Sequence, residues 1–256
     1  FIFLLSFISY SQETVVDANV YTAFNNAKKL FNSKAYAAAQ KTFININKKA
    51  TSGTSLKADA SYFDAICAIK LNQPKADKKV LTFIEENPNS NKKNKAFFNV
   101  GNYYFANKKA AYALKWYQKV DTDILSKENR KELNFKMGYG LLTTNNLTLA
   151  KNRFLPLIND AKYGNDARYY FGFIAYKLED YGIAESTLKE IADNESYKAE
   201  ISYYLLDISF KAGKFQRCID VGKKLIQTSK RKEQSEISKR KEYECVRYQH
   251  FTLNAY

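Results

Sequence analysis

Few side chains of this chain could carry out chemistry, and none of them occurs in a catalytic or metal-binding pattern. His250 is the only histidine and lies near the end of the chain, so the preceding sequence offers neither a two-histidine metal site nor a histidine-based triad. The carboxylate pairs Glu85-Glu86 and Glu179-Asp180 fall where we expect helix ends and turns, where solvated charge is their ordinary role. We therefore predict that the protein is not an enzyme, and we expect no cofactor and no metal ion.

Glycine-rich phosphate loops are also missing from the sequence. The stretch Gly138-Tyr139-Gly140 begins like a dinucleotide-binding GxGxxG motif, but the third glycine is absent and the stretch lies inside an expected helix. No GxxxxGK[ST] motif occurs. The residues that could do chemistry thus exclude the common nucleotide-dependent classes, and the informative signal lies in the helices around them.

A sequence pattern typical of paired helices recurs six times, at a spacing of 34 to 38 residues. In its clearest copy, residues 167–191, a small residue in a first helix is followed twelve residues later by a small residue in a second helix. A large residue comes four positions further on. Residues four apart share one helix face, and small residues let two helices approach to about 8–10 Å. The first small residues are Ala27, Ala65, Gly101, Gly138, Gly172 and Leu206; the second are Ala39, Asp77 (or Ala76, with one residue deleted from the turn), Ala113, Ala150, Ala184 and Cys218; the large residues are Phe43, Leu81 (or Val80), Tyr117, Phe154, Leu188 and, against the size rule, Gly222.

Short polar turns separate the two helices of most copies, which favours antiparallel helical hairpins. Prolines are rare in the chain, as expected for long helical segments. Pro156 is the exception, because it falls late in an expected second helix, where we predict a kink or an early end.

The small-and-large series resembles the tetratricopeptide repeat family over roughly residues 20–227. The match is strongest in the fifth copy and degenerate in the second and sixth, where Pro74 replaces the turn aromatic and Leu206 and Gly222 break the size rule. The resemblance implies an all-α fold, a right-handed α-solenoid superhelix of antiparallel helical hairpins with a concave groove lined by the first helices. Such stacks usually bind other proteins and do no chemistry. We predict a solenoid of about six repeats over residues 12–237 that serves as a scaffold for a protein or peptide partner.

In the family that the chain resembles, the residues three before and four after the first small residue face inward. Here these positions and one residue between them would form a mainly aromatic double row that could anchor an extended or helical peptide. The alternative is that both rows pack within the stack and leave a flat face. The predicted groove residues are Phe24, Phe31, Tyr62, Phe98, Phe105, Phe135, Tyr169, Phe173, Tyr176, Tyr203 and Phe210.

The chain is strongly basic, with 41 Lys and Arg against 26 Asp and Glu and a net charge of +15. Most lysine clusters fall at expected helix ends and turns, where cations offset the helix dipole and keep a solenoid soluble. The alternative function is a basic adaptor that docks on an anionic surface, such as lipid headgroups, lipopolysaccharide or an acidic polymer. A peripheral membrane contact is then possible, whereas no nucleic acid partner is expected for an exported protein.

The two ends of the chain differ from the repeats. Residues 1–11, FIFLLSFISYS, are too few to span a bilayer but fit the remnant of a secretory signal peptide with a small-x-small cleavage site. The alternative is a buried apolar strand or helix start. With the signal, we expect an exported bacterial protein that is periplasmic or associated with the outer membrane. Residues 238–256 are expected to be a degenerate or truncated half-repeat.

Overall fold

A computed structural model describes residues 10–228 and Lys241, and every regular element in residues 10–228 is a helix. The chain divides into two compact units, Phe1–Leu125 and Ser126–Tyr256, referred to below as unit 1 and unit 2. The predicted signal remnant lies outside the described residues except for its last two positions, which belong to the first helix. The predicted half-repeat lies outside them except for Lys241.

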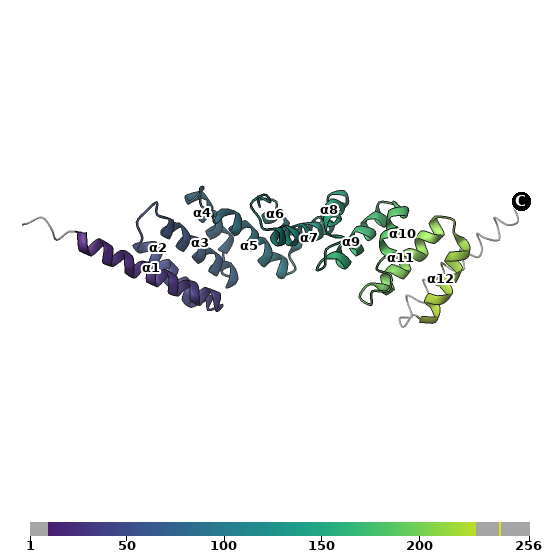
Figure 1. The fold of residues 1–256 in the computed structure, drawn as a ribbon, viewed down its shortest axis with the longest axis horizontal. Helices are drawn as coiled ribbons and strands as arrows, with labels where there is room; N and C mark the ends of the chain where they lie inside the picture. Colours follow the sequence, from purple (N-terminus) through teal and green to yellow (C-terminus); the bar gives the residue numbers. More distant parts are fainter. Residues whose placement is uncertain (1–9, 229–240, 242–256) are drawn as a thin grey trace, which may run out of the picture. The chain divides into compact units, whose positions relative to one another are not determined.

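Unit 1 consists of three helical hairpins (Figure 1), and each pairs neighbouring helices along the chain. One helix start and one helix end in this unit have a local explanation in the sequence. Thr54 caps the third helix by accepting a hydrogen bond from the backbone N–H of Lys57, and the positive charge of Lys48 and Lys49 lies in the last turn of the second. The helices are α1 (Tyr10–Asn32), α2 (Tyr36–Lys49), α3 (Ser55–Lys70), α4 (Ala76–Glu86), α5 (Lys93–Ala106) and α6 (Ala110–Tyr117).

Unit 2 also contains three hairpins, within the part of it that the structure describes. Ser126 and Asp180 provide side-chain caps for the first and fourth of its α-helices. The second α-helix ends at Phe154 and gives way to a short 3₁₀ turn that contains Pro156, which confirms the predicted early end. The elements are α7 (Lys127–Thr143), α8 (Leu147–Phe154), η1 (Leu155–Leu157), α9 (Gly164–Lys177), α10 (Tyr181–Lys189), α11 (Lys198–Lys211) and α12 (Phe215–Thr228).

The six hairpins coincide with the six predicted repeat copies, and the predicted crossing positions form their core. Each first small residue and each large residue is buried, as the pairs Ala27/Phe43 and Gly172/Leu188 illustrate. A Cβ added to Gly172 would lie 2.7 Å from Cγ of Leu188, a distance at which something must shift. The fold is therefore all-α and built from antiparallel helical hairpins, as predicted.

The second and sixth copies depart from the pattern in different ways. In the second, Ala76 and Val80 are buried whereas Leu81 is 39% exposed, so the alternative with one residue deleted from the turn is correct. In the sixth, Leu206 and Gly222 are both buried even though their sizes are exchanged. Leu206 packs with Cys218 and Ile219 of α12, so the large residue at this position lies on the first helix of the hairpin.

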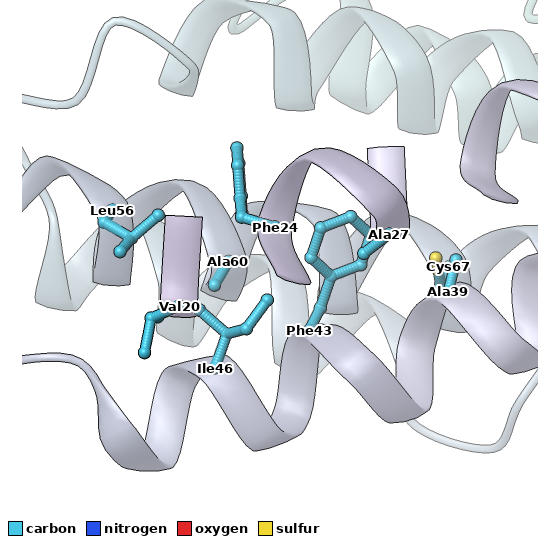
Figure 2. Close-up of a cluster of buried hydrophobic side chains, with 9 residues drawn as sticks. All are labelled: Val20, Phe24, Ala27, Ala39, Phe43, Ile46, Leu56, Ala60 and Cys67. Carbon is cyan, nitrogen blue, oxygen red and sulfur yellow. The ribbon is translucent and has the colours of Figure 1, made fainter. Parts of the chain in front are cut away.

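The core of the first hairpin extends onto the next helix. Figure 2 shows this cluster, in which α1, α2 and α3 each contribute three buried side chains. The ring of Phe63 packs against the cluster and stacks on Phe43, with ring centroids 4.9 Å apart. The members of the cluster are Val20, Phe24, Ala27, Ala39, Phe43, Ile46, Leu56, Ala60 and Cys67.

Every hairpin turn has a residue in the left-handed region seven positions after the first small residue, and the turn of the second copy has a further one, Lys75. Only the sixth copy places a glycine there, Gly213, with φ of 68°. The other five copies use ordinary residues, for which this conformation costs about 1–2 kcal/mol relative to the right-handed region. These five residues are Lys34, Asn72, Lys108, Asn145 and Glu179.

Candidate functional site

The predicted groove residues of unit 1 divide into a buried set and a half-buried set. Phe24, Tyr62 and Phe98 are only 8%, 2% and 7% exposed. Each contacts a ring on the second helix of its own hairpin, at centroid distances of 5.7, 5.6 and 6.3 Å. Phe31 and Phe105 form the half-buried set, because their side chains are more exposed than those of the other three. In unit 1, therefore, the row that precedes the small residue packs within the stack, and the row that follows it retains accessible rings.

In unit 2 all six predicted groove residues are half-buried. Neighbouring rings fix their positions: Tyr169 stacks on Tyr197 with centroids 4.4 Å apart, and Phe173 lies 5.5 Å from Tyr204. Tyr204 lies on α11, and Tyr197 immediately precedes that helix. Both contacts therefore join α9 to the start of the next hairpin. The six residues are Phe135, Tyr169, Phe173, Tyr176, Tyr203 and Phe210.

A carboxylate lies among the aromatic residues of α11. Asp207 occupies the position just after the small-residue position, between Tyr203 and Phe210 on the helix, and is 4% exposed. The hydroxyl of Tyr176 on α9 donates a hydrogen bond to Oδ2 of Asp207 at 2.7 Å. This bond ties the two hairpins together and leaves the carboxylate beside aromatic rings.

Two ammonium groups reach the same carboxylate. Lys241 Nζ lies 3.0 Å from Oδ1 of Asp207, and Lys211 Nζ lies 3.6 Å from Oδ2. Lys241 also lies 4.4 Å from the ring centroid of Phe210, and Lys211 donates a hydrogen bond to the hydroxyl of Tyr181 at 3.0 Å. We call this group of residues the Asp207 cluster: Tyr176, Tyr181, Asp207, Phe210, Lys211 and Lys241.

The Asp207 carboxylate remains ionised at neutral pH. Burial raises its pKa, but the hydrogen bond from Tyr176 and the charges of Lys241 and Lys211 more than offset that effect, so the pKa is below its ordinary value. The sequence analysis did not single out this residue. Its partners Tyr176 and Lys241 lie about one repeat away on either side, so their proximity cannot be inferred from local spacing. The one available signal was a charged residue at a position expected to face inward.

The carboxylate pairs that the sequence analysis set aside are not assembled into a site. Glu179 lies in the left-handed turn before α10. The neighbouring Asp180 caps that helix, and its Oδ2 forms an ion pair with Nζ of Lys151 at 3.2 Å. Glu85 and Glu86 are exposed at the end of α4. Within the described residues, no group of three or more His, Cys, Asp or Glu side chains could hold a metal ion.

Basic side chains are exposed at the turns, as predicted. Lys34, Lys75 and Lys108 combine exposure with left-handed backbone at the hairpin turns, and Lys109 follows in the third copy. Among the residues that the structure describes, none of the helices has both the length and the apolar character needed to cross a bilayer.

Comparisons with known proteins place the fold. No protein-family model matches the chain, and no curated protein matches it. Three solved structures resemble it over most of its length, each covering 86% of this chain. A tetratricopeptide repeat protein from Parabacteroides merdae has 12% identity, 84% of its own chain covered and a TM-score of 0.52. The C-terminal part of a TPR repeat-containing protein from Cytophaga hutchinsonii has 15% identity, 93% coverage and a TM-score of 0.50.

Pseudomonas aeruginosa pilF is the third, with 14% identity, 96% of its chain covered and a TM-score of 0.50. At such low identities, the likeness establishes the fold alone. Together with the six hairpins and their buried crossing positions, it shows that the chain has the tetratricopeptide repeat fold.

Proposed function

We propose that the protein is a non-catalytic scaffold that binds a peptide or protein partner along its inward-facing aromatic residues, chiefly those of unit 2. The observation that supports this is the half-burial of all six predicted groove residues there. Rings that are held in place by neighbours and still accessible can anchor a partner, because they give contact area without a large loss of side-chain freedom.

The chemistry of these positions favours an extended or helical peptide with apolar side chains. Family members that clamp a C-terminal carboxylate use a pattern of Lys and Asn, and the positions that would carry Lys are Phe or Tyr here. A partner bound through its apolar side chains is therefore the better match. Phe173 and Tyr203 offer the most direct test, because they are half-buried predicted groove residues on two successive hairpins.

The apolar run at residues 1–11, which fits the end of a secretory signal, supports a place for this scaffold in the bacterial cell envelope. The same context makes an envelope extract the appropriate source of partners.

The test is a pull-down from envelope extract at moderate salt, read by mass spectrometry, comparing the wild type with the double variant Phe173→Ala, Tyr203→Ala. The matched control is Leu149→Ala, Ile183→Ala, which removes two exposed apolar side chains from the second helices of the same unit. All proteins are first checked for equal helical content by circular dichroism. A discrete partner that is lost from the aromatic variant and retained by the control supports the proposal. Retention by both would reject the aromatic face as the binding surface.

The runner-up is a basic adaptor on an anionic surface, and the exposed lysines at the hairpin turns favour it. Its test is sedimentation with vesicles that contain anionic phosphatidylglycerol, compared with zwitterionic vesicles, at low and high salt. Binding that requires the anionic lipid and disappears with salt would support this function. Binding that is indifferent to salt, or absent, would exclude it.

A further inference from the structure

The Asp207 carboxylate is a buried acceptor for positive charge within the predicted binding face. Its side chain is 5% exposed, and each of its oxygens has a charged or polar partner: Lys241 on Oδ1, and the hydroxyl of Tyr176 on Oδ2. Carboxylate–ammonium pairs that are shielded from water are stronger than surface pairs, because the local dielectric is lower.

The two lysines differ in their distance from Asp207 along the chain. Lys211 lies on α11 itself, four residues after Asp207, and its ammonium also lies 5.4 Å from the ring centroid of Tyr176 and 5.1 Å from that of Tyr181. Lys241 comes from beyond the six hairpins, 34 residues along the chain from Asp207. Lys211 thus belongs to the same helix as Asp207, whereas Lys241 reaches the carboxylate from a distant position in the sequence.

Other inward rings also accept ammonium groups. Lys28 lies 5.7 Å from the ring centroid of Phe24, and Lys177 lies at the same distance from Phe173. An ammonium within about 6 Å of an aromatic face is attracted by the negative charge of that face. At Phe210 this attraction is combined with a buried carboxylate, because the same Lys241 ammonium pairs with Asp207.

We propose that Asp207 and Phe210 form a recognition site for a Lys or Arg side chain of the bound peptide, and that Lys241 occupies this site from within the same chain until a partner displaces it. This rests on the proposed function, which it deepens by adding one basic residue to an otherwise apolar ligand. A tethered occupant competes with any free ligand, so only a peptide that also engages the aromatic residues can replace it.

The test supplies the lysine of the site on a separate peptide rather than on the protein chain itself. The probe is a fluorescein-labelled peptide of residues 236–244, EISKRKEYE, titrated against the full chain by fluorescence anisotropy. We expect the Lys241→Ala protein to bind this probe at least about tenfold more tightly than the wild type, because the tethered competitor has been removed. A second probe, in which norleucine replaces the lysine at position 241, should lose that binding.

Two further variants locate the site. Adding Asp207→Asn to Lys241→Ala should abolish probe binding, because the amide keeps the shape of the side chain but not its charge. Phe210→Leu, which keeps apolar volume but removes the aromatic face, gives a second measure if the Asn variant unfolds, and should weaken binding severalfold. Lys223→Ala, which removes an exposed lysine from α12, is the matched control and should behave as the wild type.

Equal binding of the probe by wild type and Lys241→Ala, or binding by neither, would overturn the proposal. So would a Lys241→Ala protein that only loses stability, because Lys241 would then be a structural cap. The peptide measurement does not need the envelope partner, so its success would survive a failed pull-down. Conversely, a partner that depends on Phe173 and Tyr203 but binds Asp207→Asn normally would overturn this inference and leave the proposed function standing.

Discussion

Gly101 and Tyr117 fit against each other where α5 crosses α6. A Cβ added to Gly101 would lie 2.4 Å from Cε1 and 2.5 Å from Cδ1 of Tyr117, closer than real Cβ contacts occur. The ring is 1% exposed, and its hydroxyl donates a hydrogen bond to Oδ1 of Asn102 at 2.7 Å. The ring therefore has little room to move away, and the crossing distance depends on the missing side chain.

The first prediction concerns this contact. Gly101→Ala should lower the free energy of unfolding by about 1–3 kcal/mol, because overpacking outweighs the gain of about 1 kcal/mol in helix propensity. Denaturation by urea, followed by circular dichroism, measures the change. Gly182→Ala is the control, since nothing lies within 4 Å of its added Cβ, and it should stabilise the protein by up to about 1 kcal/mol. A stabilised Gly101→Ala would show that the crossing can relax.

The second prediction concerns the hairpin turns. Lys34→Gly and Glu179→Gly should each raise the melting temperature, because glycine adopts their φ of 64° and 61° without the steric cost of a side chain. The expected gain is a few tenths to about 1 kcal/mol, since the greater entropy of glycine in the unfolded chain offsets part of it. Lys41→Gly, at an exposed position inside α2, is the control and should lower the melting temperature. Equal effects at all three positions would contradict the explanation.

The third prediction concerns the ion pairs of Glu185. Hydrogen bonds from Lys189 and Lys214, together with Arg217, hold its pKa at about 2, below its ordinary value of 4.5. A lowered pKa means that this contribution is complete above about pH 4.5 and is lost as the pH falls toward 2. Glu185→Gln should therefore be less stable than the wild type at pH 7, and the difference should shrink over that range.

The control for this measurement is Glu195→Gln. Glu195 pairs with Lys198 at 3.3 Å, but its side chain is 87% exposed, so its removal should change stability little at any pH. Melting temperatures recorded across the acid range distinguish the two variants. A constant gap between wild type and Glu185→Gln from pH 7 to pH 2 would show that its ionisation is not responsible.

The fourth prediction concerns the exchanged sizes in the sixth copy. Leu206→Ala should destabilise the protein by about 2–5 kcal/mol, because it opens a cavity at a fully buried position. Gly222→Leu alone should also destabilise it, by overpacking of a buried position. The double variant restores a small-and-large pair like Ala27 and Phe43, so it should recover part of the sum of the two losses. Strict additivity in denaturation experiments would mean that the two residues do not share a crossing.

The sequence predicted the hairpins well because their crossings depend on local spacing. A small residue and a large one sixteen positions later are enough to place Gly101 against Tyr117, whatever the rest of the chain does. Pro156 acts in the same way, since its missing N–H ends α8 locally. The prediction of one continuous stack over residues 12–237 stays a prediction, because the chain divides into two compact units and each is described separately.

The candidate site was harder to predict because burial depends on neighbours from other repeats. Phe24 and Phe173 were both assigned to the groove, yet Phe24 is part of a three-helix core and Phe173 stays half-buried. The importance of Asp207 depends on Tyr176, 31 residues earlier, and on Lys241, 34 residues later. The left-handed turn residues were missed because Lys and Glu give no hint of that conformation, unlike glycine at Gly213.

The spacing of the inter-repeat contacts has a kinetic consequence. The hydrogen bond from Asn99 to Tyr62 spans 37 residues, about one repeat, and the crossing of Gly101 with Tyr117 spans only sixteen. Contacts of such short sequence separation close small loops, and chains rich in them fold quickly. A hairpin can therefore form while only its immediate neighbour along the chain is available, which suits a protein that folds progressively during its synthesis on a ribosome.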